Sequence, residues 1–389
     1  MKLNENFGLI KDSYLFALVA DKAAAYTKAN PDKKLIRLGI GDVTIPLCPA
    51  VIEAGVKAVK EMGDAATFRG YGPYEGYEFL RAAVKDYYAK RGVELGMDEI
   101  FISDGAKSDI GNIVDLFSAD NTVLVPDPVY PVYVDTNLMA GRKIVYADAN
   151  EANGFLPKPD YSVKCDIIYM CSPNNPTGAV YDKDGLKAWV DYAKKQNAII
   201  LFDSAYEFYV TDKSLPRSVY EVEGADEVAI EFCSLSKTAG FTGTRCGYTI
   251  IPKKLGSLNR MWLRRQSTKY NGVPYIVQRM AEAVFSEEGQ AQIAANVGVY
   301  MKNARLISDT LSELGIWHTG GVNSPYIWFK VPGGDSWAFF DRLLSEANVV
   351  GTPGAGFGKN GEGFLRLTAF NNYENTAEAM KRIKNMLTK

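Results

Sequence analysis

The feature that most constrains the fold is a series of short apolar runs between residues 100 and 252, each followed by a turn. The runs lack polar alternation, which is typical of strands buried on both faces of a largely parallel sheet. One apolar stripe at helical spacing lies between two of them, formed by Leu186, Trp189, Val190 and Ala193. We therefore predict an α/β fold with a mostly parallel seven-stranded sheet flanked by helices. The predicted strands are residues 100–103, 122–125, 143–146, 166–171, 198–202, 228–233 and 247–251.

The pattern changes after about Gln290, where a smaller α/β unit is predicted. A helical stripe, Ala304, Ile307, Leu311 and Leu314, ends at Gly315, and predicted strands at 326–331 and 364–368 surround a helix at 337–347. The first 42 residues are too short to form a core of their own, so we expect them to pack with this unit. The predicted division is an N-terminal arm with part of the small domain (1–42), a large domain (43–289) and a C-terminal small domain (290–389).

Charge and composition exclude several classes of function. The net charge of -2 provides no basic field for a nucleic acid. The sequence contains no stretch of about 18 apolar residues, the length that predicts a membrane span. We therefore expect a cytoplasmic protein. The five cysteines form no C-x-x-C pair, and we expect no metal site. His318 is the only histidine, and it lies in a His-Thr-Gly-Gly segment that predicts a turn and a structural role.

Polar residues follow four of the predicted strands, at the sheet edge where α/β proteins bind ligands. Each of these segments alone is a weak signal, but their joint occurrence in this order is specific. The segments are Asp104-Gly105-Ala106-Lys107, residues 172–178 (Ser-Pro-Asn-Asn-Pro-Thr-Gly), Asp203-Ser204-Ala205-Tyr206 and Ser234-Leu235-Ser236-Lys237, with Arg245 eight residues further on.

This set resembles the fold type I enzymes that use pyridoxal 5′-phosphate (PLP), in particular the class I and II aminotransferases, and the resemblance covers nearly the whole chain. It implies PLP as cofactor, with Lys237, Asp203 and Tyr206 as catalytic residues. Lys237 would attach the cofactor, because a desolvated lysine beside other cations can lose its charge and attack a carbonyl. Asp203 would keep the ring nitrogen protonated, which lets the ring accept electrons.

The resemblance also assigns binding residues. Asn175 and Tyr206 would hydrogen-bond the phenolic oxygen of the cofactor, and Tyr130 would stack on its ring. Arg366 would hold the substrate α-carboxylate through a two-pronged contact; its alternative is an internal salt bridge, since a buried charge needs a partner. For the other residues, the alternatives are structural roles: a turn amide for Asn175, a core tyrosine for Tyr206 and Tyr130, and a helix cap for Ser234 and Ser236. Phosphate contacts are assigned to Gly105, Ala106, Lys107, Ser234, Ser236 and Arg245.

Further segments resemble a narrower family, the LL-diaminopimelate aminotransferases. They are Asn4-Glu5-Asn6, Tyr14-Leu15-Phe16, residues 37–42 (Arg-Leu-Gly-Ile-Gly-Asp), Gly70-Tyr71-Gly72-Pro73 and residues 351–358 (Gly-Thr-Pro-Gly-Ala-Gly-Phe-Gly). This resemblance implies transfer of an amino group from LL-2,6-diaminopimelate to 2-oxoglutarate, which forms glutamate and, after cyclisation, tetrahydrodipicolinate. The reverse direction is the biosynthetic one, toward lysine and cell-wall precursors.

The narrower resemblance implies a homodimer with shared active sites and small-molecule amino acid and 2-oxo acid substrates. Tyr14, Asn271 and the acid near Glu75 would reach the distal end of the substrate from the partner subunit, and Tyr71 would cross to the phosphate. The family pattern Tyr-Gly-Pro-Glu-Gln-Gly is here Tyr-Gly-Pro-Tyr-Glu-Gly, so the carboxylate stands one position later. Substrate contacts are assigned to Tyr14, Gly41, Tyr74, Glu75, Lys107, Asn175, Asn271 and Arg366.

Other functions remain open at this point. A broader amino-acid aminotransferase or a PLP lyase would share every cofactor residue. A PLP-domain transcription regulator would need a DNA-reading module, and no basic helix-turn-helix segment precedes residue 40. The glycines between 354 and 361 lack the G-x-G-x-x-G spacing of a dinucleotide loop and predict a tight turn on the substrate side.

Overall fold

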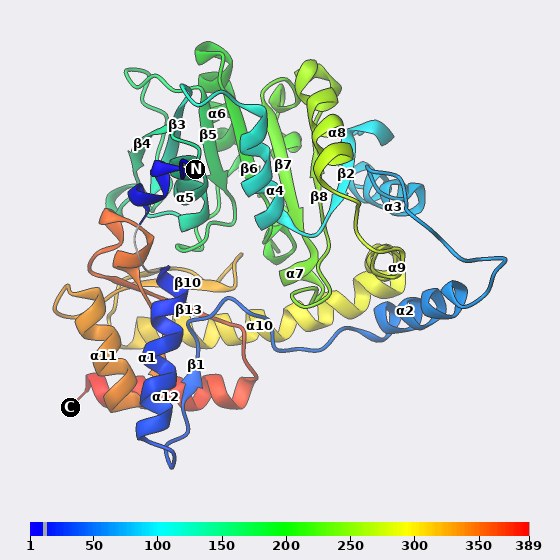
Figure 1. Cartoon of the computed structure of the whole chain (residues 1–389). Helices are drawn as coiled ribbons and strands as arrows, with labels where there is room; N and C mark the ends of the chain where they lie inside the picture. The colour runs from blue at the N-terminus through cyan, green and yellow to red at the C-terminus, as the bar shows by residue number, and fades with distance from the viewer. Residues whose placement is uncertain (11–13, 389) are drawn as a thin grey trace.

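A seven-stranded sheet forms the centre of the computed structural model, which describes residues 1–10 and 14–388 (Figure 1). Its strand order is β2-β8-β7-β6-β5-β3-β4, and β8 is antiparallel to both neighbours while the remaining pairs are parallel. All seven predicted strands are confirmed, with ends that differ by at most two residues. They are β2 (Ile100–Ser103), β3 (Thr122–Asp127), β4 (Lys143–Asp148), β5 (Ile167–Cys171), β6 (Ile199–Asp203), β7 (Ala229–Ser234) and β8 (Gly247–Ile250).

Helices cover both faces of this sheet. The predicted apolar stripe lies on α6 (Lys183–Gln196) and packs in one core with Ile168 and Ile200 of the central strands. The alternate residues Ile167 and Ile199 point to a second core on the opposite face, which includes residues of α4 (Ala106–Asn112) and α5 (Pro131–Met139). Edge strand β4 differs from the prediction of burial on both faces, because its residues are exposed or only partly buried.

The smaller α/β unit is also present. Its antiparallel sheet has the order β12-β13-β10-β9, formed by β9 (His318–Gly320), β10 (Tyr326–Lys330), β12 (Thr352–Pro353) and β13 (Phe364–Thr368). The helices α11 (Ser336–Ala347) and α12 (Tyr373–Leu387) belong to the same part of the chain. The N-terminal segment joins it as expected: β1 (Ile36–Arg37) pairs with β11 (Val349–Val350), and α1 (Leu15–Ala29) lies beside α11 (Figure 1).

One local prediction was incomplete and one was wrong. The helix expected from the apolar stripe that ends at Gly315 is present, but it is the end of α10 (Glu287–Glu313), which has 27 residues and begins well before that stripe. His318 does not lie in the turn but begins strand β9, and its Nδ1 lies 3.0 Å from the carbonyl oxygen of Ile316. The turn comes two residues later, where Gly320 and Gly321 both have positive φ.

The remaining α-helices lie around strands β2, β7 and β8, with α7 directly below β7 and β8 (Figure 1). They are α2 (Pro49–Met62), α3 (Glu78–Ala89), α7 (Leu235–Thr238), α8 (Ser257–Lys269) and α9 (Tyr275–Val284). The segment 63–77, between α2 and α3, projects away from the body of the molecule (Figure 1). Among the described residues, no helix combines the length and apolar character that crossing a bilayer requires.

Candidate active site

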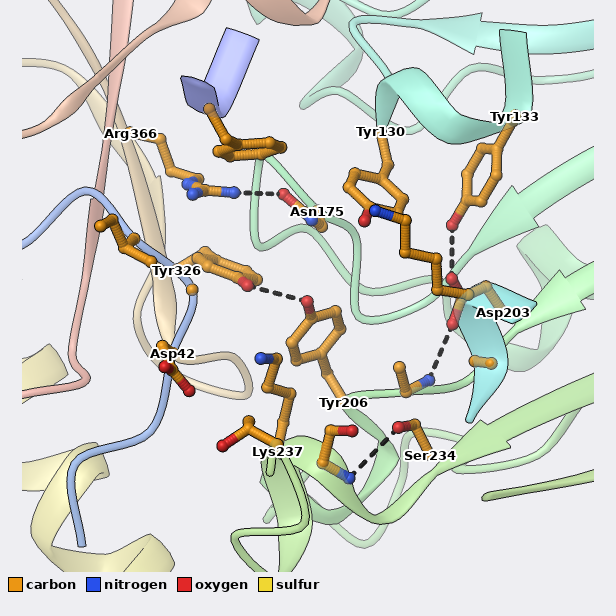
Figure 2. A pocket seen from close by; sticks show the side chains of 18 of the residues that line it. Asp42, Tyr130, Tyr133, Asn175, Asp203, Tyr206, Ser234, Lys237, Tyr326 and Arg366 are labelled. Carbon is orange, nitrogen blue, oxygen red and sulfur yellow. Dashed lines mark hydrogen bonds between the residues drawn. The ribbon is translucent and has the colours of Figure 1, made fainter. Parts of the chain in front are cut away.

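The carboxyl ends of the central strands open into a cavity of about 440 Å³, which the small sheet covers from the other side (Figure 2). It collects twelve of the predicted residues: Gly41, Ala106, Lys107, Tyr130, Asn175, Asp203, Tyr206, Ser234, Ser236, Lys237, Arg245 and Arg366. It is also lined by residues that were not predicted: Phe16, Ile40, Asp42, Tyr133, Ala205, Thr242 and Tyr326. The segments that follow the strands therefore meet at one cavity, because parallel strands bring distant segments to one edge.

Lys237 lies on α7, directly after β7, and its amine faces the cavity (Figure 2). Burial lowers the pKa of Lys237 to about 8, with further lowering by the positive charges of Arg245 and Arg366 and an opposing effect of the Asp42 carboxylate. A pKa near 8 leaves about a quarter of the amine unprotonated at pH 7.5. Lys237 is therefore poised to act as a nucleophile or base near neutral pH.

Asp203 ends β6 at the floor of the cavity. The hydroxyl of Tyr133 donates to Asp203 Oδ2 over 2.6 Å, and the amide of Ala205 donates to Oδ1 over 3.0 Å. Burial raises the pKa of Asp203, whereas these two hydrogen bonds lower it because they stabilise the carboxylate. Tyr133 was missed in the sequence, although it lies in the first turn of α5, only three residues after the predicted Tyr130 at the N-cap of that helix.

Arg366 lies on β13 and is only 1% exposed. Its Nη1 donates to Asn175 Oδ1 and its Nη2 to the Gly39 carbonyl oxygen, both over 2.6 Å. Among the described residues, no carboxylate forms an ion pair with it. Its Nε is buried without a hydrogen-bond partner in the described part of the chain. The guanidinium is thus held in place and retains donor capacity for an anionic ligand.

A cluster of donors surrounds the opposite end of the cavity. Arg245 adopts a φ of 62°, and its Nη1 donates to Ser236 Oγ over 3.0 Å and to the Thr242 carbonyl oxygen over 3.2 Å. Gly105 does not line the cavity but has a φ of 130°, and a Cβ there would lie 2.8 Å from Arg245 Nη2. Glycine therefore lets the backbone at residue 105 approach the Arg245 guanidinium. The backbone at Gly105 and this guanidinium together form a cradle suited to an anion.

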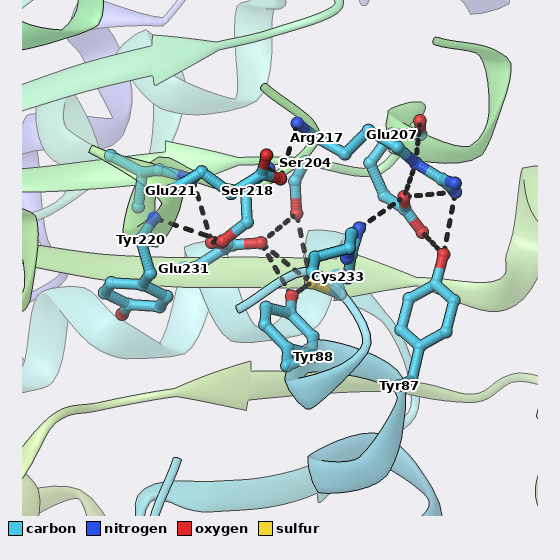
Figure 3. A network of polar contacts seen from close by, with 12 residues as sticks. Tyr87, Tyr88, Ser204, Glu207, Arg217, Ser218, Tyr220, Glu221, Glu231 and Cys233 are labelled. Carbon is cyan, nitrogen blue, oxygen red and sulfur yellow. Dashed lines mark hydrogen bonds and ion pairs between the residues drawn. The ribbon is translucent and has the colours of Figure 1, made fainter. Parts of the chain in front are cut away.

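Polar contacts of the residues that follow Tyr206 connect this part of the chain to Lys237, and Figure 3 shows those made by Glu207. The short helix η5 (Glu207–Tyr209) follows Tyr206, and the Glu207 carboxylate accepts from Arg217 Nε over 2.7 Å and from the Tyr87 hydroxyl over 2.8 Å. At the end of η5, the Tyr209 hydroxyl donates to the main-chain oxygen of Lys237 over 2.8 Å. These contacts link both cavity residues to the same turn.

Comparison with known proteins decides the family. Residues 33–383 match the family model for aminotransferase class I and II. The chain belongs to this family. It is 55% identical to an LL-diaminopimelate aminotransferase of Agathobacter rectalis (98% of this chain, 99% of the relative) and 53% identical to one of Methanosphaera stadtmanae (99% of both). The solved L,L-diaminopimelate aminotransferase of Chlamydomonas reinhardtii is 41% identical, with a TM-score of 0.94 over 99% of this chain and 98% of that one.

Membership of this family confirms the fold type I prediction. It defines the chemistry as transfer of an amino group between amino acids and 2-oxo acids, which are small-molecule substrates. The assignment of Tyr14 to the partner's site stays a prediction. In the single chain, its ring lies 5.3 Å from Nζ of Lys107 and 5.4 Å from the ring of Phe16. Within one chain, Tyr14 therefore lies beside its own cavity.

Four other predicted residues of the aminotransferase lie outside the cavity of their own chain: Tyr71, Tyr74, Glu75 and Asn271. Gln278 ties their two segments together, since its Oε1 accepts from the Tyr77 amide over 2.9 Å and its Nε2 donates to the Val273 carbonyl oxygen over 2.8 Å. We name residues 70–77 and 271–273 the distal edge. Tyr71 is 92% exposed there.

Proposed function

We propose that this aminotransferase uses PLP and acts on LL-2,6-diaminopimelate, transferring its amino group to 2-oxoglutarate. The reverse reaction would form LL-diaminopimelate from tetrahydrodipicolinate with glutamate as donor. The observation that carries this proposal is identity of 53–55% with relatives of that name over 98–99% of the chain.

The residues of the cavity fit PLP. Arg245, Ser234 and Ser236 would hold its phosphate beside the cradle at Gly105, while Asn175 and Tyr206 would hydrogen-bond its phenolic oxygen. The buried carboxylate of Asp203 would pair with the ring nitrogen, and Tyr130 would cover the ring. The fit rests on this donor set and on the space that a Cβ at Gly105 would fill.

When bound, PLP would supply an electron sink for the bonds of the substrate α-carbon. Lys237 would attach the cofactor through Nζ and, once displaced by substrate, would move the α-proton as a base. Its pKa of about 8 keeps a useful fraction of the amine unprotonated near neutral pH. Arg366 would hold the α-carboxylate common to every substrate, because Asn175 and Gly39 have already fixed its guanidinium.

Discrimination between substrates must then lie at the other end of the substrate. The site has to accept a five-carbon dicarboxylate and also a longer acid with a second amino acid head group. Lys107 of the same chain and Tyr14, together with Tyr74, Glu75 and Asn271 of a second subunit, would read the distal ammonium and carboxylate. A site with such polar groups rejects analogues that lack the matching groups by roughly 10⁴ to 10⁵, because its own groups stay unpaired.

A homodimer with shared sites and a cytoplasmic location are part of this proposal. The exposed distal edge supports the dimer, since its tyrosines and Asn271 serve no cavity in their own chain. We also propose two domains: a small one formed by residues 1–42 and 290–389, and a large one formed by residues 43–289. The pairing of β1 with β11 supports it, because it joins the two ends of the chain.

An absorbance scan of purified protein, repeated after addition of LL-diaminopimelate, tests cofactor and donor together. We expect a band of bound cofactor that bleaches with this donor, and we expect lysine and the meso isomer to be poor donors. A higher kcat/KM for aspartate, alanine or an aromatic amino acid would replace the proposal by a broader aminotransferase. The shifted acid at Glu75 is the feature that favours this second candidate.

A further inference from the structure

Tyr326 is a cavity residue to which the proposed function assigns no role. It lies at the start of β10 in the small sheet and is 1% exposed. Its hydroxyl lies 2.8 Å from the hydroxyl of Tyr206, which follows the end of β6 in the large sheet (Figure 2). The two rings meet edge to face, with centroids 5.0 Å apart. One hydrogen bond between two tyrosines therefore joins the two sheets inside the cavity.

The same residue also contacts the proposed carboxylate site. The guanidinium carbon of Arg366 lies 4.5 Å from the centroid of the Tyr326 ring, a distance suited to a cation–π contact. Gly41 packs against the hydroxyl, since a Cβ there would lie 2.6 Å from Tyr326 Oη. The ring and the hydroxyl of Tyr326 thus face two different functional groups and can be separated by substitution.

We propose that Tyr326 is a positioning residue whose hydroxyl donates to Tyr206 and thereby directs the Tyr206 proton toward the cofactor. The proposal rests on the proposed function, in which Tyr206 donates to the phenolic oxygen of PLP. A phenol has one proton to donate. If Tyr206 gave that proton to Tyr326, it would have none left for the cofactor. Donation by Tyr326 leaves the Tyr206 proton available and strengthens it as a donor, since hydrogen bonds in a chain polarise one another.

The surroundings keep both hydroxyls protonated. Burial raises the pKa of Tyr326 and raises that of Tyr206 well above its usual value, so each phenol still carries its proton near neutral pH. The charged and titratable groups that face the pair are Arg366, Asp203, Cys171, Tyr130, Tyr209, Lys237 and Asp42. Replacement of Tyr326 by phenylalanine removes none of these groups and keeps the ring over Arg366.

The decisive variant is Tyr326→Phe, examined in the cofactor-bound protein without substrate. A stronger Tyr206 hydrogen bond favours the anionic phenolic oxygen and so lowers the pH at which the absorbance of the bound cofactor changes. Loss of the Tyr326 hydroxyl should therefore raise this midpoint by about 0.5 to 1 pH unit. The dissociation constant of the cofactor should rise about two- to tenfold. KM for the amino donor should change less than about twofold, because the ring remains over Arg366.

A double-mutant cycle separates this role from a merely structural one. In a Tyr206→Phe background, Tyr326→Phe should cause no further shift of the midpoint, because the chain is already broken. Tyr192→Phe is the matched control: Tyr192 is fully buried and donates to the Val163 carbonyl oxygen, away from the cavity. It should lower the melting temperature without moving the midpoint.

The outcomes distinguish this inference from the proposed function. The role of Tyr326 is overturned if the midpoint is unchanged in Tyr326→Phe, or if Tyr326→Phe shifts it equally in the wild-type and Tyr206→Phe backgrounds. A cofactor band in the wild-type protein would still support PLP binding in that case. Absence of a cofactor band in the wild-type protein overturns both. A midpoint that rises in Tyr326→Phe only when Tyr206 is present supports the inference.

Discussion

The cofactor end of the cavity and the distal edge differ in how much of a binding site one chain supplies. At the cofactor end, Asp203 and Arg366 are buried, and each is held by hydrogen bonds of 2.6 Å. At the distal edge, Tyr71 and Asn271 are exposed, and the Glu75 carboxylate lies 3.9 Å from Arg81 in an ion pair. The first region is preorganised by the sheet, whereas the side chains of the second are open to solvent in the single chain.

This difference indicates a division of labour. Groups fixed by strand ends keep one geometry without further ordering, which suits a cofactor shared by every substrate. Exposed tyrosines and carboxylates lose rotamer entropy when they bind, and they interact strongly only when a partner excludes water from them. We therefore expect substitutions at the cofactor end, and of Tyr71, which would reach the phosphate of the partner's cofactor, to abolish chemistry. Substitutions of Tyr74, Glu75 and Asn271 should alter only which substrate is used.

The largest effect is expected for Lys237→Ala. Without this amine the protein has neither the attachment point nor the base, so transamination and the covalently bound cofactor should both be lost. Activity assays and mass spectrometry after borohydride reduction measure the two losses. Lys187→Ala, which removes a lysine of a surface ion pair with Asp191, should behave as wild type. Undiminished turnover in Lys237→Ala would break the assignment of the cofactor end.

A smaller but still large loss is expected for Asp203→Asn. Removing a buried carboxylate from a cationic ring nitrogen costs about 3 to 5 kcal/mol, and each 1.36 kcal/mol is about tenfold in rate. We therefore expect kcat to fall roughly a hundredfold to a few thousandfold. The asparagine oxygen can still accept from the Ala205 amide, so the melting temperature should change little. A loss below tenfold would argue that Asp203 does not face the ring nitrogen.

Sequence reasoning predicted the cofactor end well because its residues come in contiguous motifs directly after apolar strands. Seven unbroken runs such as 166–171 show the strands, and the rule that ligands bind beyond their ends shows the site. The strand order was not predictable, because the position of antiparallel β8 between β2 and β7 depends on long-range packing. The first part of helix α10 was not predicted, although Ile293, Val297 and Tyr300 continue its apolar spacing, because apolar residues also occupy exposed positions between them.

The residues that sequence reasoning missed depend on contacts between distant segments. Tyr326 meets Tyr206 across 120 positions of the chain, and nothing in the local sequence of β10 marks it. Tyr14 is assigned to the partner subunit by resemblance, and in the single chain its ring lies beside Lys107. Local patterns identify elements and motifs, whereas which side chains meet is set by tertiary packing.

The comparison between the two regions can be tested by mixing subunits. If Tyr71 serves the partner's cavity, a hybrid of Lys237→Ala and Tyr71→Ala subunits contains one intact site. Random exchange makes half of the dimers hybrid, each with one active site of two, so about a quarter of wild-type activity should return. Activity of the mixture is measured together with subunit exchange by native mass spectrometry. Mixtures that exchange and stay inactive would show that the cavity and the distal edge serve the same chain.

The smallest effect is expected at the distal edge itself, for Glu75→Gln. Here the carboxylate stands one position later than in the family pattern, and Tyr74 occupies the family's acidic position. If Glu75 still pairs with the distal ammonium of LL-diaminopimelate, loss of its charge removes a partly exposed ion pair worth about 0.7 to 1 kcal/mol. KM for LL-diaminopimelate should then rise about three- to fivefold, with kcat nearly unchanged.

Glutamate provides the control, because it has no distal ammonium to pair with Glu75. Its KM should be unaffected by Glu75→Gln. An equal rise of KM for both donors would mean that Glu75 acts through Arg81, 3.9 Å away, and only shapes the loop. Arg81→Gln separates the two cases, because it removes the partner of Glu75 within the chain. If Glu75 only shapes the loop, Arg81→Gln should also raise KM for both donors. If Glu75 binds the distal ammonium, Arg81→Gln should not raise KM for LL-diaminopimelate alone.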